Sequence, residues 1–334
     1  MRILITTADY GNYRIHFDAL AKGIPHRWGD SEFHYQPDGG SYDAWVVWQS
    51  QRGLPEAMTV RCPATRTLLV LREPPDILTL PDDFTRQFGG VLGPDPKVLA
   101  KELFFSQFGQ VWHVERNREF LTSYEIPEKT QGISAVTSNK ADTSGQRRRL
   151  SLLETLKGHF GEKLIHFGRG FRPTDSKWDA IWPFRYHLAL ENGSWPHYWS
   201  EKVCDAWLGW SLPLYTGCQT LEQDVPPEAF IRLDAADHSK AVQQIEEAIS
   251  NDEWRRRLPA IEEARRLVLE KYHFYPTLLQ TLASLPNSTS EQVTLRPAFS
   301  LAFSSTQKWR FRLARLKKML PSKVHATVHF PHLP

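Results

Sequence analysis

Short runs of apolar residues recur along the first third of the chain, and most of them end at Gly, Pro, Asp or Asn. The runs cover residues 2–6, 44–48, 67–71 and 90–92. They are continuous rather than alternating, as is typical of strands buried on both faces of a parallel sheet. Segments long enough for crossover helices lie at residues 16–22 and 95–108. This alternation predicts an α/β domain.

A polar, irregular segment at residues 115–146 follows and is the predicted linker. A second alternation comes after it. We expect helices at 149–160, from 201, at 240–249 and at 252–270, and strands at 163–167, 186–190 and 212–215. The prediction is therefore two doubly wound domains, 1–130 and 131–285, that face a cleft and are followed by a tail at 286–334. Ligands of such sheets bind beyond the carboxyl ends of the strands.

Composition agrees with this division, because 334 residues exceed the ~150 that one domain usually holds. The three cysteines (Cys62, Cys204, Cys218) form no CxxC pair, and the histidines show no HExxH spacing, so no metal centre is predicted. The N-terminal MRILITTADYG lacks the pattern of a signal peptide, and no apolar run approaches the length of a membrane span. We therefore expect a cytoplasmic protein.

The tail carries a concentrated positive charge, although the formal net charge of the chain is only +3. No acidic residue follows Glu291, and QKWRFRLARLKKML at residues 307–320 places Trp309 and three leucines on one helical face. Such a basic amphipathic helix favours peripheral binding to anionic membranes. A helix that packs across the domain junction is the alternative.

The richest chemistry lies in ALENGSWPHYWSEKVCDAWLGWSLPLYTG. The predicted strand 186–190 runs out into Glu191 and Asn192, and Ser200 is a plausible N-cap for the helix that follows. Lys202 then lies in the first turn, where it opposes the helix dipole, and an anion shared with the backbone amides would explain it. The alternative is a solvated lysine. Carboxylate, carboxamide and ammonium groups around one cleft suit a nucleotide sugar.

These residues resemble the signature of glycosyltransferase family 10, the α-1,3/1,4-fucosyltransferases. EN at 191–192, SEK at 200–202 and LPLYTG at 212–217 stand where the family has FEN, TEK and a proline-containing strand ending in glycine. VPPEAFIRLD at 225–234 resembles a further family segment. Leu190 for Phe and Ser200 for Thr are departures, and the resemblance is weak in the first domain.

The resemblance implies a GT-B fold, the donor GDP-fucose, a glycan acceptor and an α-1,3 linkage. By matching position, Lys202 would contact the donor phosphates and Glu201 the fucose or ribose. Asn192 and Tyr198 would contact the nucleotide sugar, and we count Glu191 with this donor set.

The resemblance also implies a phosphate-binding arginine. The segment SNKADTSGQRRRLSLLETL resembles the family segment that contains it, and the best alignment places Arg149 at that position. Its planar guanidinium can hold two diphosphate oxygens at once. Arg147 and Arg148 are adjacent, so the register stays open. A solvated basic turn is the alternative.

An inverting sugar transfer also needs a carboxylate to accept the acceptor's proton. TLLVLREPPDI places Glu73 directly after a buried strand, in a segment similar to the family's, and Glu73 is the predicted base. Pairing with Arg72 is the rival role, and Asp76 is the second choice for the base. The segment Tyr10, Gly11, Asn12 follows the first strand and is expected either to touch the acceptor or to form a plain turn.

The predicted reaction is a single displacement that requires no metal, with an auxiliary Mn²⁺ or Mg²⁺ left open. One alternative keeps the fold and uses another nucleotide sugar. A second is a non-catalytic protein that binds polyanions through RRR and the tail, although no RNA-binding motif occurs and nucleic acid is not the expected partner. A third is a non-catalytic carbohydrate-binding relic.

Overall fold

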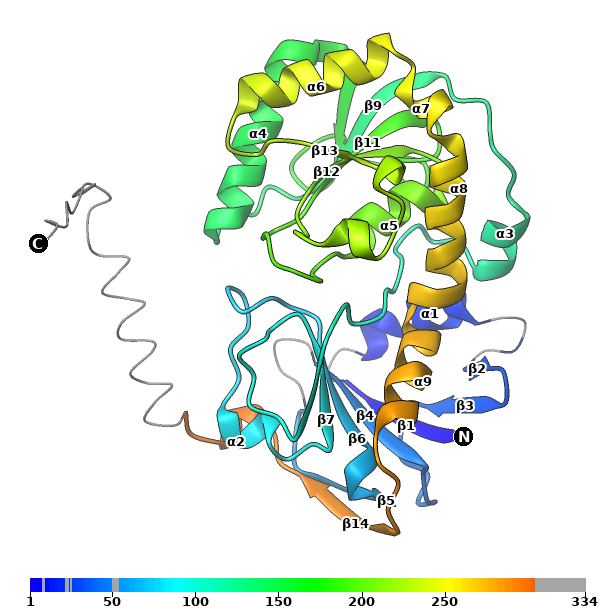
Figure 1. The fold of residues 1–334 in the computed structure, drawn as a ribbon, viewed down its shortest axis with the longest axis vertical. Coiled ribbons are helices and arrows are strands. Elements are labelled where there is room, and N and C mark those ends of the chain that lie inside the picture. The colour runs from blue at the N-terminus through cyan, green and yellow to red at the C-terminus, as the bar shows by residue number, and fades with distance from the viewer. Residues whose placement is uncertain (8–9, 22–23, 25, 50–53, 304–334) are drawn as a thin grey trace, which may run out of the picture.

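The computed structural model describes residues 1–7, 10–21, 24, 26–49 and 54–303. The predicted membrane-binding helix at 307–320 lies outside the described residues, as do the side chains of Tyr10 and Asn12. Two sheets dominate the described part, one in the lower and one in the upper half of Figure 1.

The first sheet has the strand order β2-β3-β1-β4-β6-β7-β8 among the described residues, and all neighbours are parallel except β2 and β3. Its strands are β1 (Arg2–Thr6), β2 (Arg27–Trp28), β3 (Ser31–His34), β4 (Ala44–Gln49), β6 (Thr67–Leu71), β7 (Gly90–Gly93) and β8 (Glu102–Phe105). The helices α1 (Tyr10–Leu20), α2 (Asp82–Thr85) and α3 (Arg118–Ser123) belong to the same part of the chain.

Both faces of the first sheet are covered, as the continuous apolar runs predicted. Successive residues of β4 point to opposite faces, so Val46 and Trp48 belong to one buried cluster while Trp45 and Val47 belong to another. All four side chains are at most 1% exposed. The apolar runs at β1, β4, β6 and β7 are therefore confirmed as central parallel strands.

The second sheet is parallel throughout, in the order β10-β9-β11-β12-β13. Its strands are β9 (Gln131–Val136), β10 (Leu164–Phe167), β11 (Phe184–Leu190), β12 (Leu212–Thr216) and β13 (Ile231–Arg232). Because the chain moves outward from β9 in both directions, the crevice beyond β9 and β11 is the topological switch point.

Helices flank the second sheet in two groups. In Figure 1, α4 (Ser144–Phe160) and α6 (His238–Ser250) lie together on one side, and α5 (Glu201–Leu208) and α8 (Leu258–Leu267) on the other. The short α7 (Glu253–Arg256) leads into α8, which continues through a π-helical turn, Val268–Tyr272.

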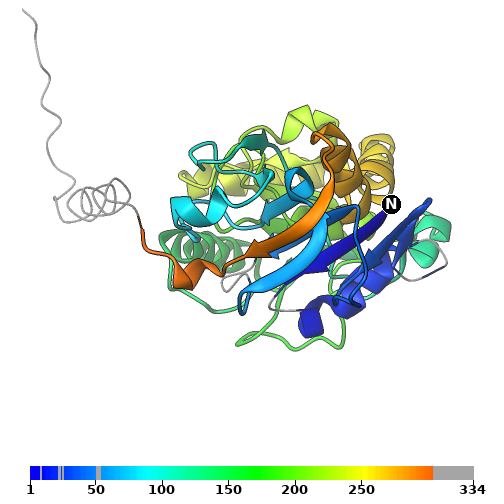
Figure 2. The same ribbon diagram turned by 90° about the horizontal axis from the view of Figure 1, so that it is seen from below.

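The chain then returns to the first sheet. In α9 (Phe274–Ser284), the Phe274 ring lies 5.1 Å from that of Phe17, and Tyr275 stacks on Phe33 at 4.3 Å. Strand β14 (Ser290–Leu295) pairs antiparallel with β5 (Met58–Pro63), and Figure 2 shows the two side by side. The predicted tail thus begins just before a strand that belongs to a sheet.

Three sequence predictions of secondary structure are wrong. Residues 95–108 hold the edge strand β8 instead of a helix, and half-exposed Leu103 and Phe105 gave its sequence no clear period. The predicted linker contains the central strand β9, whose small residues Gly132, Ser134 and Ala135 lower its apolar content although the last two are fully buried. Residues 10–12 begin α1 rather than form a loop.

Candidate functional site

Two cavities lie at the carboxyl ends of the second sheet. The first, of about 510 Å³, is named here the second-sheet cavity, and it is lined by the start of α4, the ends of β11 and β12, and the loop after β13. The second, of about 210 Å³, is named the intersheet cavity. Residues of α1, β4 and the segment after β6 line it from one side, and Tyr198 and α5 line it from the other. Asn192 lines both cavities.

Arg149 spans the switch point of the second sheet. Its Nη1 donates to the Asn192 side chain at 2.7 Å, and its Nη2 lies 3.4 Å from the Ser138 carbonyl. These two acceptors follow β11 and β9, the two strands at the switch point. Arg149 is buried, and its Nε has no hydrogen-bond partner among the described residues. Two nitrogens of the guanidinium are thus fixed at the switch point, while Nε has no acceptor there in the described part of the chain.

The neighbouring arginines are placed differently. Arg147 is exposed and donates to the carbonyls of Ala141 and Asp142, which precede α4. Arg148 is exposed and lines the second-sheet cavity. Of the RRR run, Arg149 is therefore the one held against the ends of β9 and β11.

The backbone at the start of α4 lies close to the backbone of Asn192, after β11. Thr143 and Gln146 form a capping box that fixes the first turn. A β-carbon at Gly145 would collide with the Asn192 carbonyl, so only glycine lets the helix start this near to the end of β11. The contact between Arg149 and Asn192 depends on this approach.

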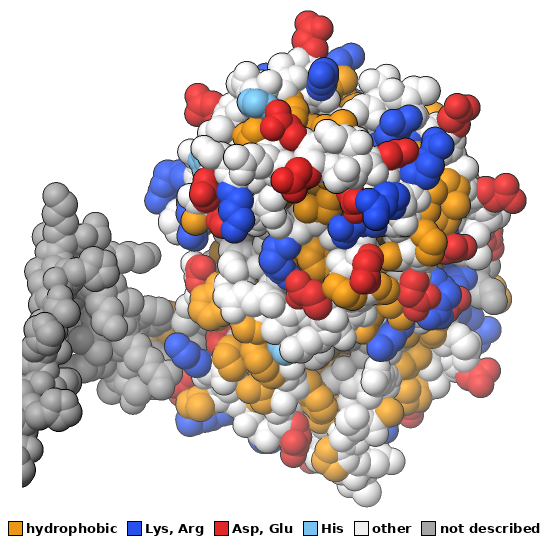
Figure 3. All heavy atoms as spheres, turned by 45° about the horizontal axis from the view of Figure 1, so that its top comes forward, with side chains coloured by type: hydrophobic (Ala, Val, Ile, Leu, Met, Phe, Trp, Pro, Cys, Tyr) orange, Lys and Arg blue, Asp and Glu red, His pale blue; other side chains and the backbone are white. Residues whose placement is uncertain are grey.

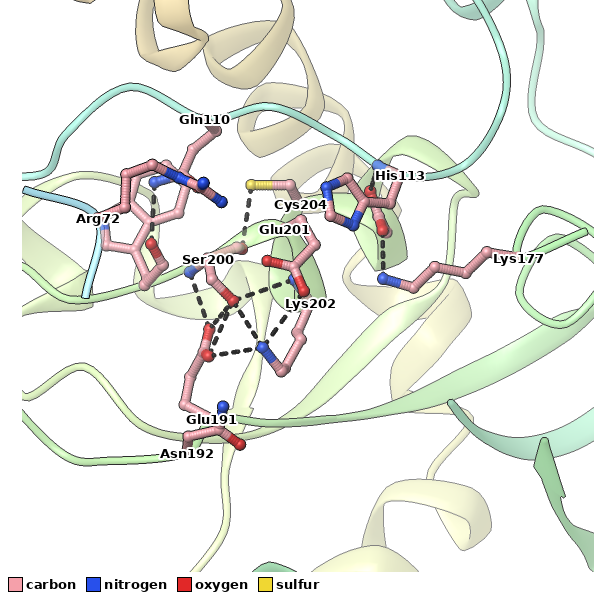
Figure 4. Close-up of polar contacts among 12 residues, drawn as sticks. Arg72, Gln110, His113, Lys177, Glu191, Asn192, Ser200, Glu201, Lys202 and Cys204 are labelled. Atoms are coloured by element: carbon pink, nitrogen blue, oxygen red, sulfur yellow. Dashed lines mark hydrogen bonds and ion pairs between the residues drawn. The ribbon is translucent and has the colours of Figure 1, made fainter. Parts of the chain in front are cut away.

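Glu191 anchors the start of α5. Its carboxylate accepts hydrogen bonds of 2.8 Å from both the backbone N–H and the hydroxyl of Ser200, the helix N-cap. The Lys202 ammonium lies 3.3 Å from Glu191, 3.3 Å from Glu201 and 3.1 Å from the Ser200 hydroxyl (Figure 4). The predicted N-cap is confirmed, and Glu191 faces this network rather than open space.

The charges at α5 depend on one another. Burial alone would lower the pKa of Lys202, but the carboxylates of Glu191 and Glu201 outweigh it and raise that pKa above its ordinary value. Burial would raise the pKa of Glu201, but Lys202, His113 and Lys177 together hold it well below its ordinary value. Glu201 is therefore a carboxylate and Lys202 a cation at neutral pH, and both line the intersheet cavity.

Glu73 occupies the boundary between two cavities. It lines the intersheet cavity and also a pocket of about 160 Å³, the first-sheet cavity, whose walls include Leu78, Thr85 and Leu99. Burial raises the pKa of its carboxyl group. No ion pair joins it to Arg72 among the described residues, so the rival role proposed for Glu73 is not observed. Asp76 is exposed and lines neither cavity.

Sequence reasoning missed several residues of the site. The loop between β8 and α3 brings Gln110 and His113 into the intersheet cavity, and burial lowers the pKa of His113 to about 3. Nothing in the pattern of that loop marked them. Arg232, Asp234 and Lys240 line the second-sheet cavity, and only the resemblance at 225–234 could have pointed to the first two.

The structure brings the predicted donor set together in one region. Arg149, Glu191 and Asn192 line the second-sheet cavity, while Tyr198, Glu201 and Lys202 line the intersheet cavity with Asn192. Among the residues that the structure describes, no group of three His, Cys, Asp or Glu side chains gathers as metal ligands do. Within those same residues, no helix is long and apolar enough to cross a membrane.

Comparisons with known proteins support the fold. Residues 126–257 match glycosyltransferase family 10 (fucosyltransferase), C-terminal part. Two crystal structures titled α1,3-fucosyltransferase, one with GDP and one with GDP-fucose, superpose with TM-scores of 0.50 and 0.51 at 15% and 14% identity. In each case 82% of this chain and 92% of the other are covered. No curated protein matches in sequence. The predicted GT-B fold is confirmed.

Proposed function

We propose that this chain, an enzyme whose residues 126–257 match the C-terminal part of glycosyltransferase family 10, transfers fucose from GDP-fucose to a hydroxyl group of a glycan. The observation that carries the proposal is the network around Asn192, which connects Arg149 with the cavity that holds Lys202 and Glu201. This network combines cations with carboxylate and carboxamide groups that suit sugar hydroxyls, and it lies at the topological switch point of the second sheet.

The donor would lie along the two cavities that Asn192 lines. The nucleoside would occupy the larger second-sheet cavity, where Asp234 offers a carboxylate to ribose hydroxyls. The diphosphate would reach the Asn192 junction, where Arg149 and the start of α5 offer donors. The fucose would then enter the intersheet cavity beside Glu201 and Tyr198.

The transfer would be a single displacement. The Glu73 carboxylate removes the proton from an acceptor hydroxyl, whose oxygen bonds to the anomeric carbon of fucose. The bond from that carbon to the diphosphate oxygen breaks, and its electron pair leaves with GDP. Lys202 and Arg149 stabilise the charge that develops on the diphosphate. One displacement inverts the anomeric configuration, and we propose an α-1,3 linkage.

Three finer assignments belong to the same proposal. The basic side chains that neutralise the leaving group make a metal dispensable, so transfer should persist in EDTA.

The acceptor is an oligosaccharide or glycoconjugate, and its hydroxyl reaches Glu73 from the first-sheet cavity. The 307–320 segment holds a cytoplasmic enzyme on anionic membranes, which co-sedimentation of the full chain with phosphatidylserine vesicles would test.

A calorimetric titration tests the donor. GDP and GDP-fucose should bind, and UDP-sugars should not. GDP-mannose tests the alternative of another sugar on the same nucleotide. Hydrolysis or transfer monitored by GDP release, with a panel of oligosaccharides, then tests the reaction. An absence of binding to every nucleotide would reject the proposal and favour a polyanion binder. Against that alternative, Lys and Arg are intermingled with Asp and Glu on the face shown in Figure 3, so the described residues of this face form no continuous basic surface.

A further inference from the structure

Arg72 is a cation at the end of strand β6 of the first sheet, and it lines the intersheet cavity. It follows β6 directly, and its neighbour in sequence is Glu73. Despite this proximity, no ion pair joins Arg72 to a carboxylate among the described residues. In Figure 4 its side chain comes from the side of the first sheet, whereas Glu201 and Lys202 come from α5.

Two aromatic rings hold the Arg72 guanidinium in place. Its central carbon lies 3.9 Å from the centroid of a Trp48 ring and 4.5 Å from that of Tyr13. Its Nη2 donates to the Tyr13 hydroxyl at 3.0 Å. Trp48 is itself 1% exposed, and its edge-on contact with Tyr13 at 4.8 Å makes the aromatic platform rigid.

The fixed guanidinium leaves hydrogen-bond donors unused. Nε is buried and has no partner among the described residues. A buried N–H group without an acceptor is costly, and an acceptor that a ligand supplies is one way to remove that cost. Arg72 lines the same cavity of about 210 Å³ as Lys202 and Asn192. Its position therefore suits an anion that enters from the donor side.

We infer that Arg72 binds the diphosphate of the donor from the first sheet, opposite Lys202, and stabilises it as the leaving group. The inference rests on the proposed function. A diphosphate at the Asn192 junction would meet Lys202 on one side and the planar fork of Arg72 on the other. Because Arg72 follows a strand of the first sheet and Lys202 belongs to α5 beside the second sheet, the complete phosphate site needs both parts of the chain.

Besides its contact with the diphosphate, Arg72 also affects the neighbouring Glu73. The guanidinium held on the aromatic platform forms no ion pair with Glu73 among the described residues, and its charge offsets part of the rise in the Glu73 pKa that burial causes. A lysine at position 72 would keep the charge but lose the planar contact with Trp48 and the two-point contact with phosphate.

Ligands that differ by one phosphate test the inference. Calorimetry would measure GDP, GMP and inorganic pyrophosphate with the wild type, Arg72→Met and Arg72→Lys. We expect Arg72→Met to weaken GDP and pyrophosphate about 10- to 100-fold while GMP changes little. The affinity of Arg72→Lys for GDP and pyrophosphate should lie between those of the wild type and Arg72→Met. Arg72→Lys also tests the inference if the Met variant does not fold. Arg116→Met is the matched control, because Arg116 also lies over aromatic rings, at 5.5 Å from Phe120, but lines neither cavity.

Kinetics separate the donor from the acceptor as the ligand of Arg72. For Arg72→Met, kcat/KM for GDP-fucose should fall while the acceptor KM stays constant. A raised acceptor KM with unchanged GDP affinity would overturn the inference, and so would a variant that equals the wild type. A wild type that binds no GDP would reject the proposed function, whereas failure of the Arg72 inference appears only in the variants.

Discussion

The Lys202 ammonium group lies 3.3 Å from a Glu191 carboxylate whose side chain is fully buried. Glu191 directly follows β11 and Lys202 lies in the first turn of α5, so the pair fixes the helix start against the strand end. The lysine that opposed the helix dipole in the sequence is thus stabilised by two carboxylates. The pair sits between the two cavities that we assign to the donor.

Removal of Lys202 should damage both stability and donor binding. Lys202→Met leaves the Glu191 charge buried without a cation, so unfolding free energy should fall by about 3–5 kcal/mol. GDP affinity, measured by calorimetry, should fall at least about tenfold through the lost phosphate contact. Lys163→Met, at an exposed lysine outside both cavities, is the control.

A double variant distinguishes the two effects of Lys202. Glu191→Gln together with Lys202→Met removes both charges and should recover much of the lost stability in denaturant unfolding. It should not recover GDP binding. Full GDP affinity in either variant would show that Lys202 has a structural role only.

Glu73→Gln should slow transfer strongly and spare donor binding. Loss of a general base lowers kcat by about 10²- to 10⁴-fold, while the GDP dissociation constant should stay unchanged because Glu73 belongs to the acceptor side. Asp76→Asn is the matched control and tests the second choice for the base. A larger loss in Asp76→Asn than in Glu73→Gln would reassign the base.

The pH dependence of transfer reports the state of Glu73. A base acts when deprotonated, so kcat/KM should rise as pH increases through the Glu73 pKa. Because burial raises that pKa, the rising limb should lie above the ~4.3 of an exposed glutamate. A rising limb at the ordinary glutamate position, or one that persists in Glu73→Gln, would contradict the assignment.

The three consecutive arginines should differ in their effect on GDP. Arg149→Ala removes a buried guanidinium that bonds Asn192, and it should weaken GDP most. Arg148→Ala removes an exposed charge at the cavity wall and should cost less, because exposed charges are screened by water. Arg147→Ala should leave affinity nearly unchanged. Calorimetry of the three variants in one buffer gives the order of their GDP affinities. If Arg147→Ala lost the most affinity, the phosphate-binding position of the family would align with Arg147 instead of Arg149.

Two glycines of α4 give a matched pair of substitutions. Gly145→Ala forces the helix away from Asn192 and should weaken GDP while it lowers the melting temperature. Gly158→Ala, where a β-carbon meets nothing within 4 Å, should stabilise the protein by about 0.4–1 kcal/mol and leave binding unchanged. Equal effects of the two substitutions would show that the close approach at Gly145 is dispensable.

The sequence by itself determined the elements whose signals are local. Continuous apolar runs identified the central strands, Ser200 identified the start of α5, and the EN and SEK motifs identified residues that do line the cavities. Burial on both faces, helix capping and a motif each leave a mark within a few neighbouring residues. The edge strand β8 and the small-residue strand β9 leave a weaker mark, because pairing with neighbouring strands defines them.

Only the tertiary structure decided which groups meet across the two sheets. Pairing with Glu73 was a role that the sequence left open for Arg72, yet Arg72 contacts Trp48 and Tyr13 and lines the cavity that Lys202 lines from the other side. The return of α9 and β14 to the first sheet likewise follows from packing with Phe17, Phe33 and β5. Such contacts join residues far apart in the chain, so no local pattern encodes them.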